Sequence, residues 1–572
     1  MNTTAKTCLS GLFFFSLYFA FGQQVAAQSA SVQADTFSDI KPNDNALNFE
    51  KNNTLGPDNL NSLYEVLVDY RNYNTAFLIE GNTIEVLTKL NFGGAKANDN
   101  DFGLNSYASS LIDSEAFGHD FGSMLLIDPT SHLVTGQYLH FSTQCKDAEN
   151  QPAGCQLGGG NPQPISSNDY VEINGSLEVN GSPTNIVNER GFRTFGGNDV
   201  VLVGAAANVS VASDFDLGGG NDQLRVSGDV TVGTDFIAGT GDDQISAEFG
   251  SSFVVSNDFD LGDGRDKFIS RGRTIILGNL YGGFGNDIVE IRGESPVGYG
   301  VINVEGKVEL GEGNDVFLLK SPKDISVVKR QLSLGAGDDV LDIRLETTRL
   351  SVGVDSDPLG IDTDYNINFG EGSDKFINRG QVKSGWGIVF NGADFDDGSD
   401  DWGDLILNYE NAKISTYAGI NFSSSGRGTI DNYGIIEVAS DQGRQILFGA
   451  GNDRIINRSG AVIDVNGVIR MGAGDDFIAN DGVMKASHGI DLGEGDDRLR
   501  IGNELLSLDP GRVVDGGAGR DDLLFGSQRL ANSISAGVDA SQQPLSNRRL
   551  ISASSLANRF VNFEHLIQLE GT

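Results

Sequence analysis

A glycine-rich turn sequence returns along most of the chain and constrains its fold more than any other feature. It reads apolar, Gly, x, Gly, x, Asp, x, apolar, as in LGGGNDQLR (217–225), LGDGRDKFI (261–269) and LGEGDDRLR (492–500). A motif that returns in this way indicates a repeat architecture. The aspartates that mark the successive copies are Asp199, Asp222, Asp243, Asp266, Asp287, Asp315, Asp339, Asp374, Asp400, Asp453, Asp476, Asp497 and Asp521.

The spacing of these markers sets the size of the repeat. Most neighbouring markers lie 21 to 28 residues apart, and the two longer steps are 35 and 53 residues. The longest step contains a degenerate copy, GRGTI (426–430), in which we expect Ile430 to stand at the marker position. Fourteen copies then cover residues 195 to 525, approximately.

Apolar and polar residues alternate between the turns, which predicts strands. A unit of about 23 residues is too short for a helix with its connections, and it predicts one coil of a parallel β-solenoid, with coils stacked about 4.8 Å apart. Glycine provides the backbone conformations that sharp corners need. The apolar residues before and after each turn are expected to point inward, and the marker aspartates to face outward at every corner.

Stacked corners would place the marker carboxylates roughly 5 Å apart, where each like-charge pair costs about 0.8 kcal/mol in water. A bound cation removes this repulsion, and calcium accepts carboxylate and backbone oxygens. All thirteen marker aspartates are therefore candidate calcium ligands. In the alternative, each aspartate caps its own turn by accepting backbone N–H groups without an ion, and Arg265 and Arg520 help to neutralise the row.

The turns resemble two known groups of proteins. The GxGxD sequence looks like the calcium-binding RTX repeat, and residues 449–484 resemble the repeats of autotransporter passengers, which are right-handed β-helices. The last residues, FVNFEHLIQLEGT (560–572), are similar to the coil that often ends such passengers. The resemblance implies an all-β, right-handed parallel β-helix of about 14 coils with a non-repeating, β-rich N-terminal cap.

The chain divides into four segments on this interpretation. Residues 1–27 contain an apolar run of about 14 residues that ends in small side chains, which predicts a secretory signal rather than a membrane anchor. Residues 28–190 form the cap, 191–530 the repeats and 531–572 a C-terminal coil. In an exported chain the pair Cys145 and Cys155 favours a local disulfide over a metal site. No later stretch predicts a membrane span.

The net charge of −39 repels nucleic-acid phosphates and argues against nucleic-acid binding. Acids also gather in ADFDDGSDDWGD (393–404), near both tryptophans. Trp386, Trp402, Asp400 and Asp404 are thus a candidate carbohydrate site, and the alternative is a wider calcium loop with tryptophan as a core or cap residue.

The predicted function is that of a secreted or cell-surface structural or adhesive protein, located in the periplasm or on the outer surface of a bacterium. Calcium is its candidate cofactor, and an extracellular surface or polysaccharide its candidate partner. No catalytic residues are assigned. The second hypothesis is a carbohydrate-active β-helix enzyme, either a polysaccharide lyase or a hydrolase.

Overall fold

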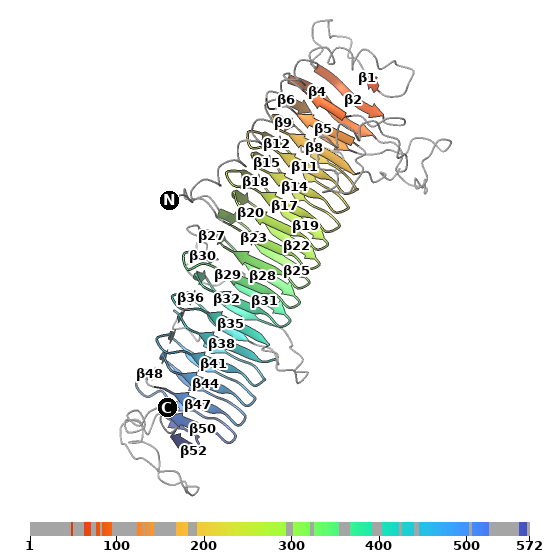
Figure 1. Cartoon of the computed structure of the whole chain (residues 1–572). Helices are drawn as coiled ribbons and strands as arrows, with labels where there is room; N and C mark the ends of the chain where they lie inside the picture. Colours follow the sequence, from red (N-terminus) through yellow and green to blue (C-terminus); the bar gives the residue numbers. More distant parts are fainter. Residues whose placement is uncertain are drawn as a thin grey trace, which may run out of the picture.

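The computed structural model of the chain consists of strands and turns. It describes residues 47–49, 62–69, 76–79, 83–93, 123–127, 129, 132–135, 138–141, 168–180, 191–292, 301–320, 325–353, 366–391, 403–422, 426–439, 445–502, 506–525 and 560–568. These residues contain 52 strands and no helix, so the described part of the chain has no helix that could cross a membrane. Successive coils stack into an elongated rod (Figure 1).

Each coil contributes strands to three parallel faces, and each strand pairs with its equivalents in the coils before and after it. Face 1 follows the glycine turn and contains 18 strands. They are β3 (Ala76–Ile79), β5 (Ser123–Ile127), β8 (Asp169–Ile173), β11 (Val200–Val203), β14 (Gln223–Val226), β17 (Gln244–Ala247), β20 (Lys267–Ser270), β23 (Ile288–Ile291), β26 (Val316–Leu319), β29 (Val340–Ile343), β32 (Lys375–Asn378), β35 (Asp404–Asn408), β38 (Gly428–Asn432), β41 (Arg454–Asn457), β44 (Phe477–Asn480), β47 (Arg498–Ile501), β50 (Asp522–Phe525) and β52 (His565–Gln568).

Face 2 comes next along each coil, and its strands alternate inward apolar and outward polar residues. They are β6 (His132–Thr135), β9 (Ser176–Val179), β12 (Asn208–Val211), β15 (Asp229–Val232), β18 (Ser252–Val255), β21 (Arg273–Ile276), β24 (Val301–Val304), β27 (Ile325–Val328), β30 (Arg349–Val352), β33 (Gln381–Ser384), β36 (Lys413–Thr416), β39 (Ile435–Val438), β42 (Val462–Val465), β45 (Val483–Ala486) and β48 (Leu506–Leu508).

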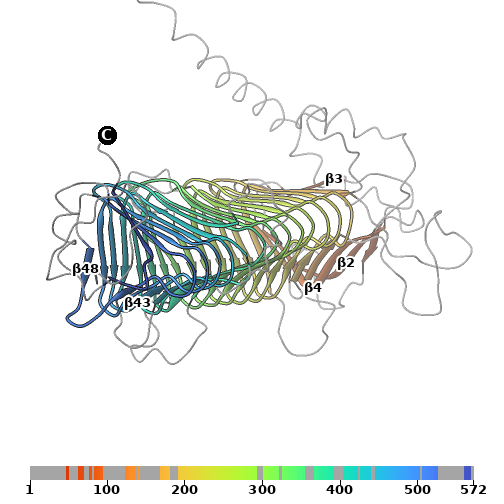
Figure 2. The same ribbon diagram turned by 90° about the horizontal axis from the view of Figure 1, so that it is seen from below.

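Face 3 leads into the next glycine turn, and several of its strands extend into that turn. They are β7 (Tyr138–Phe141), β10 (Gly191–Arg193), β13 (Phe215–Asp216), β16 (Phe236–Ile237), β19 (Phe259–Asp263), β22 (Leu280–Phe284), β25 (Val308–Glu312), β28 (Leu332–Ala336), β31 (Ile367–Glu371), β34 (Gly387–Phe390), β37 (Gly419–Phe422), β40 (Gln445–Leu447), β43 (Val468–Arg470), β46 (Gly489–Asp491), β49 (Val514–Asp515) and β51 (Phe560–Val561). Figure 2 shows the coils from a second direction.

The parallel β-solenoid predicted from the sequence is therefore confirmed. Between residues 191 and 530, face 1 contains fourteen strands, from β11 to β50, which match the fourteen predicted copies one for one. At the C-terminal end of the described structure, β51 pairs with β49 and β52 pairs with β50. Residues 531–559 lie outside the described residues.

The solenoid begins before the first glycine turn, which differs from the expected non-repeating cap over residues 28–190. Strands β5 and β8 continue face 1 in parallel, and β6 and β9 continue face 2. Further towards the N-terminus, β4 (Thr83–Gly93) pairs with both β6 and β7, and β2 (Ser62–Asp69) pairs with β4. The pair of β1 (Leu47–Phe49) with β2 is antiparallel and lies at this end of the rod.

The interior of the rod is a continuous core of inward side chains from all three faces. On face 3, Phe192, Phe215, Phe236 and Phe259 follow one another in successive coils, with ring centroids 4.4 to 5.8 Å apart. Because the coils are in register, identical residue types fall in columns, and each column buries its members against the next coil.

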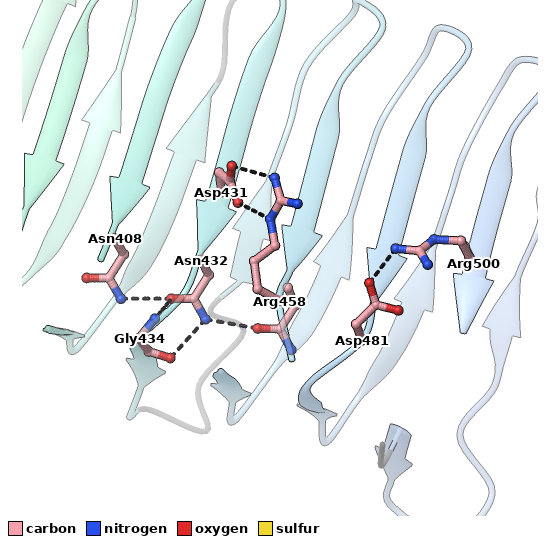
Figure 3. A network of polar contacts seen from close by, with 8 residues as sticks. Asn408, Asp431, Asn432, Gly434, Arg458, Asp481 and Arg500 are labelled. Atoms are coloured by element: carbon pink, nitrogen blue, oxygen red, sulfur yellow. Dashed lines mark hydrogen bonds and ion pairs between the residues drawn. The ribbon is translucent and has the colours of Figure 1, made fainter. Parts of the chain in front are cut away.

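A row of buried asparagines lies at the end of face 1. Asn408 donates from Nδ2 to Oδ1 of Asn432 at 2.8 Å, and Asn432 donates in the same way to Asn457 at 2.9 Å (Figure 3). Bonds of this kind also link Asn378 to Asn408 and Asn457 to Asn480. The row satisfies most of its buried amide groups by coil-to-coil bonding, and Nδ2 of Asn480 has no partner among the described residues.

Candidate metal centre: the aspartate column

The described marker aspartates lie inside the rod, contrary to the prediction that they face outward. Asp222, Asp243 and Asp497 have no exposed side-chain surface, and Asp266 and Asp476 are 1% exposed. The physical reason is the alternation of the strand that follows. Asp222 is two residues before Leu224 and four before Val226, and residues at this spacing point to the same side of an extended chain. Since Leu224 and Val226 are in the core, Asp222 points there as well.

Hydrogen bonds join these carboxylates into a column. The backbone N–H of Asp199 donates to Oδ1 of Asp222 at 2.7 Å, and that of Asp222 donates to Oδ1 of Asp243 at 2.7 Å. The same bond links every successive pair as far as Asp374, and then Asp453 through Asp521. Each carboxylate thus binds the main chain of the preceding coil, whereas the capping alternative placed this bond within its own turn.

The column is longer than the repeat motif predicts. The backbone N–H of Asp169 donates to Oδ1 of Asp199 at 2.7 Å, and that of Asp521 donates to a carboxylate oxygen of Glu564 at 2.6 Å. Neither residue has the glycine turn, but Asp169 precedes Val171 and Ile173 with the same two-residue alternation, and this signal could have found it. We call the following set the aspartate column: Asp169, Asp199, Asp222, Asp243, Asp266, Asp287, Asp315, Asp339, Asp374, Asp404, Asp453, Asp476, Asp497, Asp521 and Glu564.

Two marker assignments need correction in the irregular part of the repeat. Asp404, not Asp400, belongs to the column, because Asp374 donates its backbone N–H to Oδ1 of Asp404 at 3.1 Å. In the next coil the marker position is occupied by Gly428, which pairs with Asp404 in the β35–β38 register. Ile430, which was expected there, pairs with Ile406 and is a fully buried core residue.

A second, outer row of side chains lies beside the column at the residue before each marker. Here the bond runs the other way, since the backbone N–H of Asn221 donates to Oδ1 of Asn198 in the preceding coil at 2.8 Å. Asp496 donates likewise to Asp475 at 2.8 Å. These outer side chains are solvent-exposed, and the Arg265 guanidinium bonds the Asp242 carboxylate in this row. Charges in the outer row are therefore compensated by water and arginine.

The two glycines of each turn allow the coils to approach closely beside the column. Gly241 has φ of +125°, and a Cβ at this position would lie 2.1 Å from the carbonyl oxygen of Gly220 in the preceding coil. An L-residue side chain would have to overlap that oxygen. The carbonyl oxygen of the second glycine is thus directed at the next coil.

The second carboxylate oxygen, Oδ2, is the unusual feature of the column. A Cβ added at Gly282 would lie 2.9 Å from Oδ2 of Asp287, so this oxygen is beside the residue that begins the turn, on the inner side. The oxygens that are buried and have no hydrogen-bond partner among the described residues include Oδ2 of Asp222, Asp243, Asp266, Asp287, Asp315, Asp339, Asp453, Asp476, Asp497 and Asp521. An ionised oxygen in this state is costly unless something compensates it.

Burial raises the pKa of these carboxyl groups, because it removes the charged form from water. The pKa of Asp222 rises to about 9, with the neighbouring Asp199 and Asp243 charges adding to the effect of burial. The pKa rises to about 8 at Asp266 and Asp476, and to about 7 at Asp497. The N–H donated from the preceding coil lowers each pKa, but by less than burial raises it.

The donor set of the column fits a hard cation better than a transition metal. The described residues contain no group of three or more His, Cys, Asp or Glu side chains that could hold a metal ion. What each coil offers is one inward carboxylate oxygen together with glycine carbonyl oxygens. Calcium accepts both kinds of oxygen in flexible numbers, whereas zinc prefers nitrogen and sulfur.

The structure describes two of the four residues of the candidate carbohydrate site, Trp386 and Asp404. Asp404 is 2% exposed and occupied by its bond from Asp374, so it is not accessible to a dissolved sugar, and this assignment is wrong. Trp386 lies in the turn between β33 and β34, where its carbonyl oxygen accepts the N–H of Ala418. Asp400 and Trp402 lie outside the described residues, as do Cys145 and Cys155 with their predicted disulfide.

Comparisons with known proteins assign the chain to no family. No known protein family and no curated protein matches the sequence. Among solved structures, the chain is similar to a hyperactive, Ca²⁺-dependent, β-helical antifreeze protein from an Antarctic bacterium, with 19% sequence identity and a TM-score of 0.28. The match covers 63% of this chain and 88% of that chain. At so low a TM-score, nothing about the site of this chain follows from it.

Proposed function

We propose that this chain is an exported structural or adhesive rod, secreted or held at the cell surface, whose coils are stabilised by calcium bound along the aspartate column. The observation that supports this most strongly is the repeated, buried and unpaired Oδ2. One such oxygen recurs at coil after coil, and its repetition points to a common partner. A structural role follows from the uninterrupted stack of coils from β3 to β52.

A cation accounts for the unpaired oxygens better than a proton does. A protonated carboxyl group carries an O–H that needs an acceptor when it is buried. In the described structure Oδ2 of Asp476 and its equivalents have no hydrogen-bond partner. A cation at the same place would bind the oxygen directly and would also cancel the repulsion between neighbouring carboxylates, which lie about one strand spacing apart.

The expected affinity suits a location outside the cell. Each ion would bind carboxylate oxygens from adjacent coils and complete its shell with main-chain carbonyl oxygens. Calcium sites with few charged ligands are weak, and extracellular modules work with dissociation constants of about 10⁻⁴ to 10⁻³ M. This agrees with the predicted secretory signal, which lies outside the described residues. An extracellular surface or polysaccharide is the proposed partner.

The test uses the full mature chain, titrated with calcium and with magnesium in calorimetry, and melted with and without chelator. Calcium is expected to bind with measurable heat and to raise the melting temperature in a concentration-dependent way. Magnesium is expected to do less, because it demands a compact octahedron and retains its waters. Asp476→Asn should reduce the calcium effect, and Asp475→Asn is the matched control, since Asp475 is exposed in the outer row.

The proposal fails if calcium gives no specific heat and chelator leaves the melting temperature unchanged. It also fails if Asp475→Asn reduces the calcium effect as much as Asp476→Asn does, because the ions would then be bound by the exposed row rather than by the column.

A further inference from the structure

The aspartate column is interrupted at a single coil, the one that contains Gly428. In the registers of β35, β38 and β41, Gly428 lies between Asp404 and Asp453. Among the coils that the structure describes between Asp169 and Glu564, it is the one with no carboxylate at the column position. We call this coil the junction.

Aromatic rings fill the space that a carboxylate would occupy at the junction. A Cβ at Gly428 would lie 2.8 Å from Cδ1 of Phe448 and 2.9 Å from Cγ of Phe422. These two rings stack with centroids 4.7 Å apart and an interplanar angle of 1°, and both are buried. The stack continues to Phe390 at 4.5 Å. Neither an aspartate side chain nor a hydrated ion has room between these rings and Gly428.

The hydrogen bonds of the column also change at the junction. The backbone N–H of Asp404 donates to the carbonyl oxygen of Arg427 at 3.0 Å, where every earlier member of the column donates to a carboxylate. The N–H of Gly428 donates to Oδ1 of Asp453 at 2.6 Å. The carboxylates of Asp404 and Asp453 are therefore two coils apart, or roughly 10 Å at the usual strand spacing. No column carboxylate lies in the coil between them.

We propose that the junction divides the column into two calcium-binding segments, 169–404 and 453–564, which load and stabilise independently. This proposal rests on the proposed function and adds how calcium binding is divided along the rod. Because an ion between coils needs carboxylates on both sides, no ion can link the coil of Asp404 to that of Asp453. One half of the rod can thus lose calcium while the other keeps it.

The experiment follows hydrogen exchange of the full chain by mass spectrometry during a calcium titration, which gives a midpoint of protection for each strand. Asp374→Asn is read at β26, whose marker Asp315 is two coils away within an intact segment. Asp404→Asn is read at β41, whose marker Asp453 is two coils away across the junction. The first variant is expected to raise the calcium midpoint by about fivefold, the lower range for coupled sites, and the second to leave it unchanged.

The division is overturned if Asp404→Asn shifts the midpoint at β41 as much as Asp374→Asn shifts that at β26. That outcome leaves calcium binding itself intact. If instead no strand responds to calcium, the proposed function and the division fail together.

Discussion

The backbone N–H of Asp476 donates to Oδ1 of Asp497, one coil further along the rod, at 2.8 Å. One residue earlier, the bond runs in the opposite direction, because the N–H of Asp496 donates back to Oδ1 of Asp475 at 2.8 Å. The two adjacent acids of each turn therefore connect the same two coils by hydrogen bonds that run in opposite directions. The inner acid is buried and the outer acid is solvated, so the two make different contributions to stability.

Stability in the absence of divalent cations should fall as pH rises. The folded-state pKa of the column is raised, to about 6 at Asp243 and Asp287 and to about 9 at Asp222, while an unfolded aspartate has a pKa of about 3.9. The folded state therefore binds more protons, and its stabilisation is complete below pH 4, approximately, and lost as pH rises through these folded-state values.

Melting temperatures from pH 4 to 9 in metal-free buffer measure this dependence. Saturating calcium should flatten the curve above pH 6, approximately, because the ion replaces the proton as partner of the carboxylates. A melting temperature that rises with pH in metal-free buffer would contradict the prediction.

Gly241→Ala should be strongly destabilising. Its φ of +125° is unfavourable for alanine, and the new Cβ would lie 2.1 Å from the Gly220 carbonyl oxygen. The two effects together are expected to cost about 3 kcal/mol or more. Gly250→Ala is the matched control, since Gly250 has φ of +84° with no atom within 4 Å of the added Cβ, and it should cost about 1 to 2 kcal/mol. Urea unfolding of both variants gives the comparison, and equal losses would be evidence against close coil contact at the turn.

Asn432→Ala should disrupt the asparagine row from its middle. The variant removes the bond accepted from Asn408, the bond donated to Asn457 and the bond from the Gly434 N–H to Oδ1. A buried polar group that loses its partner costs about 1 to 3 kcal/mol, and the expected loss is at the upper end of this range. Asn303→Ala, on the outward side of face 2, is expected to cost less than about 0.5 kcal/mol. Hydrogen exchange at β35 and β41 should increase only in the first variant.

Arg458→Met should lower the free energy of unfolding only slightly, although the ion pair that it removes has good geometry. Arg458 bonds both carboxylate oxygens of Asp431 at 2.8 Å, as Figure 3 shows, and its guanidinium lies 5.1 Å from the Tyr433 ring centroid. The arginine side chain is 40% exposed, and exposed pairs contribute less than about 1 kcal/mol. The loss should shrink further in high salt. A loss that is large and independent of salt would show that the pair behaves as a buried one.

Local patterns were sufficient to predict the coils. The Gly-x-Gly-x-Asp turn and the two-residue alternation after it act within a few residues, and they predicted the parallel solenoid and its fourteen repeat coils. The N-terminal coils escaped detection because β5 and β8 follow no glycine turn. Only the pairing of β8 with β11, and of β5 with β8, places them in face 1.

The side to which the marker carboxylates point was also present in the sequence, but it was interpreted wrongly. Asp222, Leu224 and Val226 occupy every second position of an extended segment, so their side chains point to the same side. Burial of the two apolar residues therefore implies burial of the aspartate. Assigning only the apolar residues to the core leaves the aspartate facing outward. In the structure it lies inside, where the backbone N–H of the neighbouring coil donates to it.

Membership of the column was decided only by tertiary structure. Asp404 rather than Asp400, and Gly428 rather than Ile430, occupy the marker positions because register is set by pairing with strands 24 to 30 residues away. The same holds for Asp169 and Glu564, which lack the motif and are aligned by the coils they contact. Sequence spacing determines which residues can begin a coil, whereas stacking of whole coils determines which side chains meet, because the hydrogen bonds that align them run between coils and not along the chain.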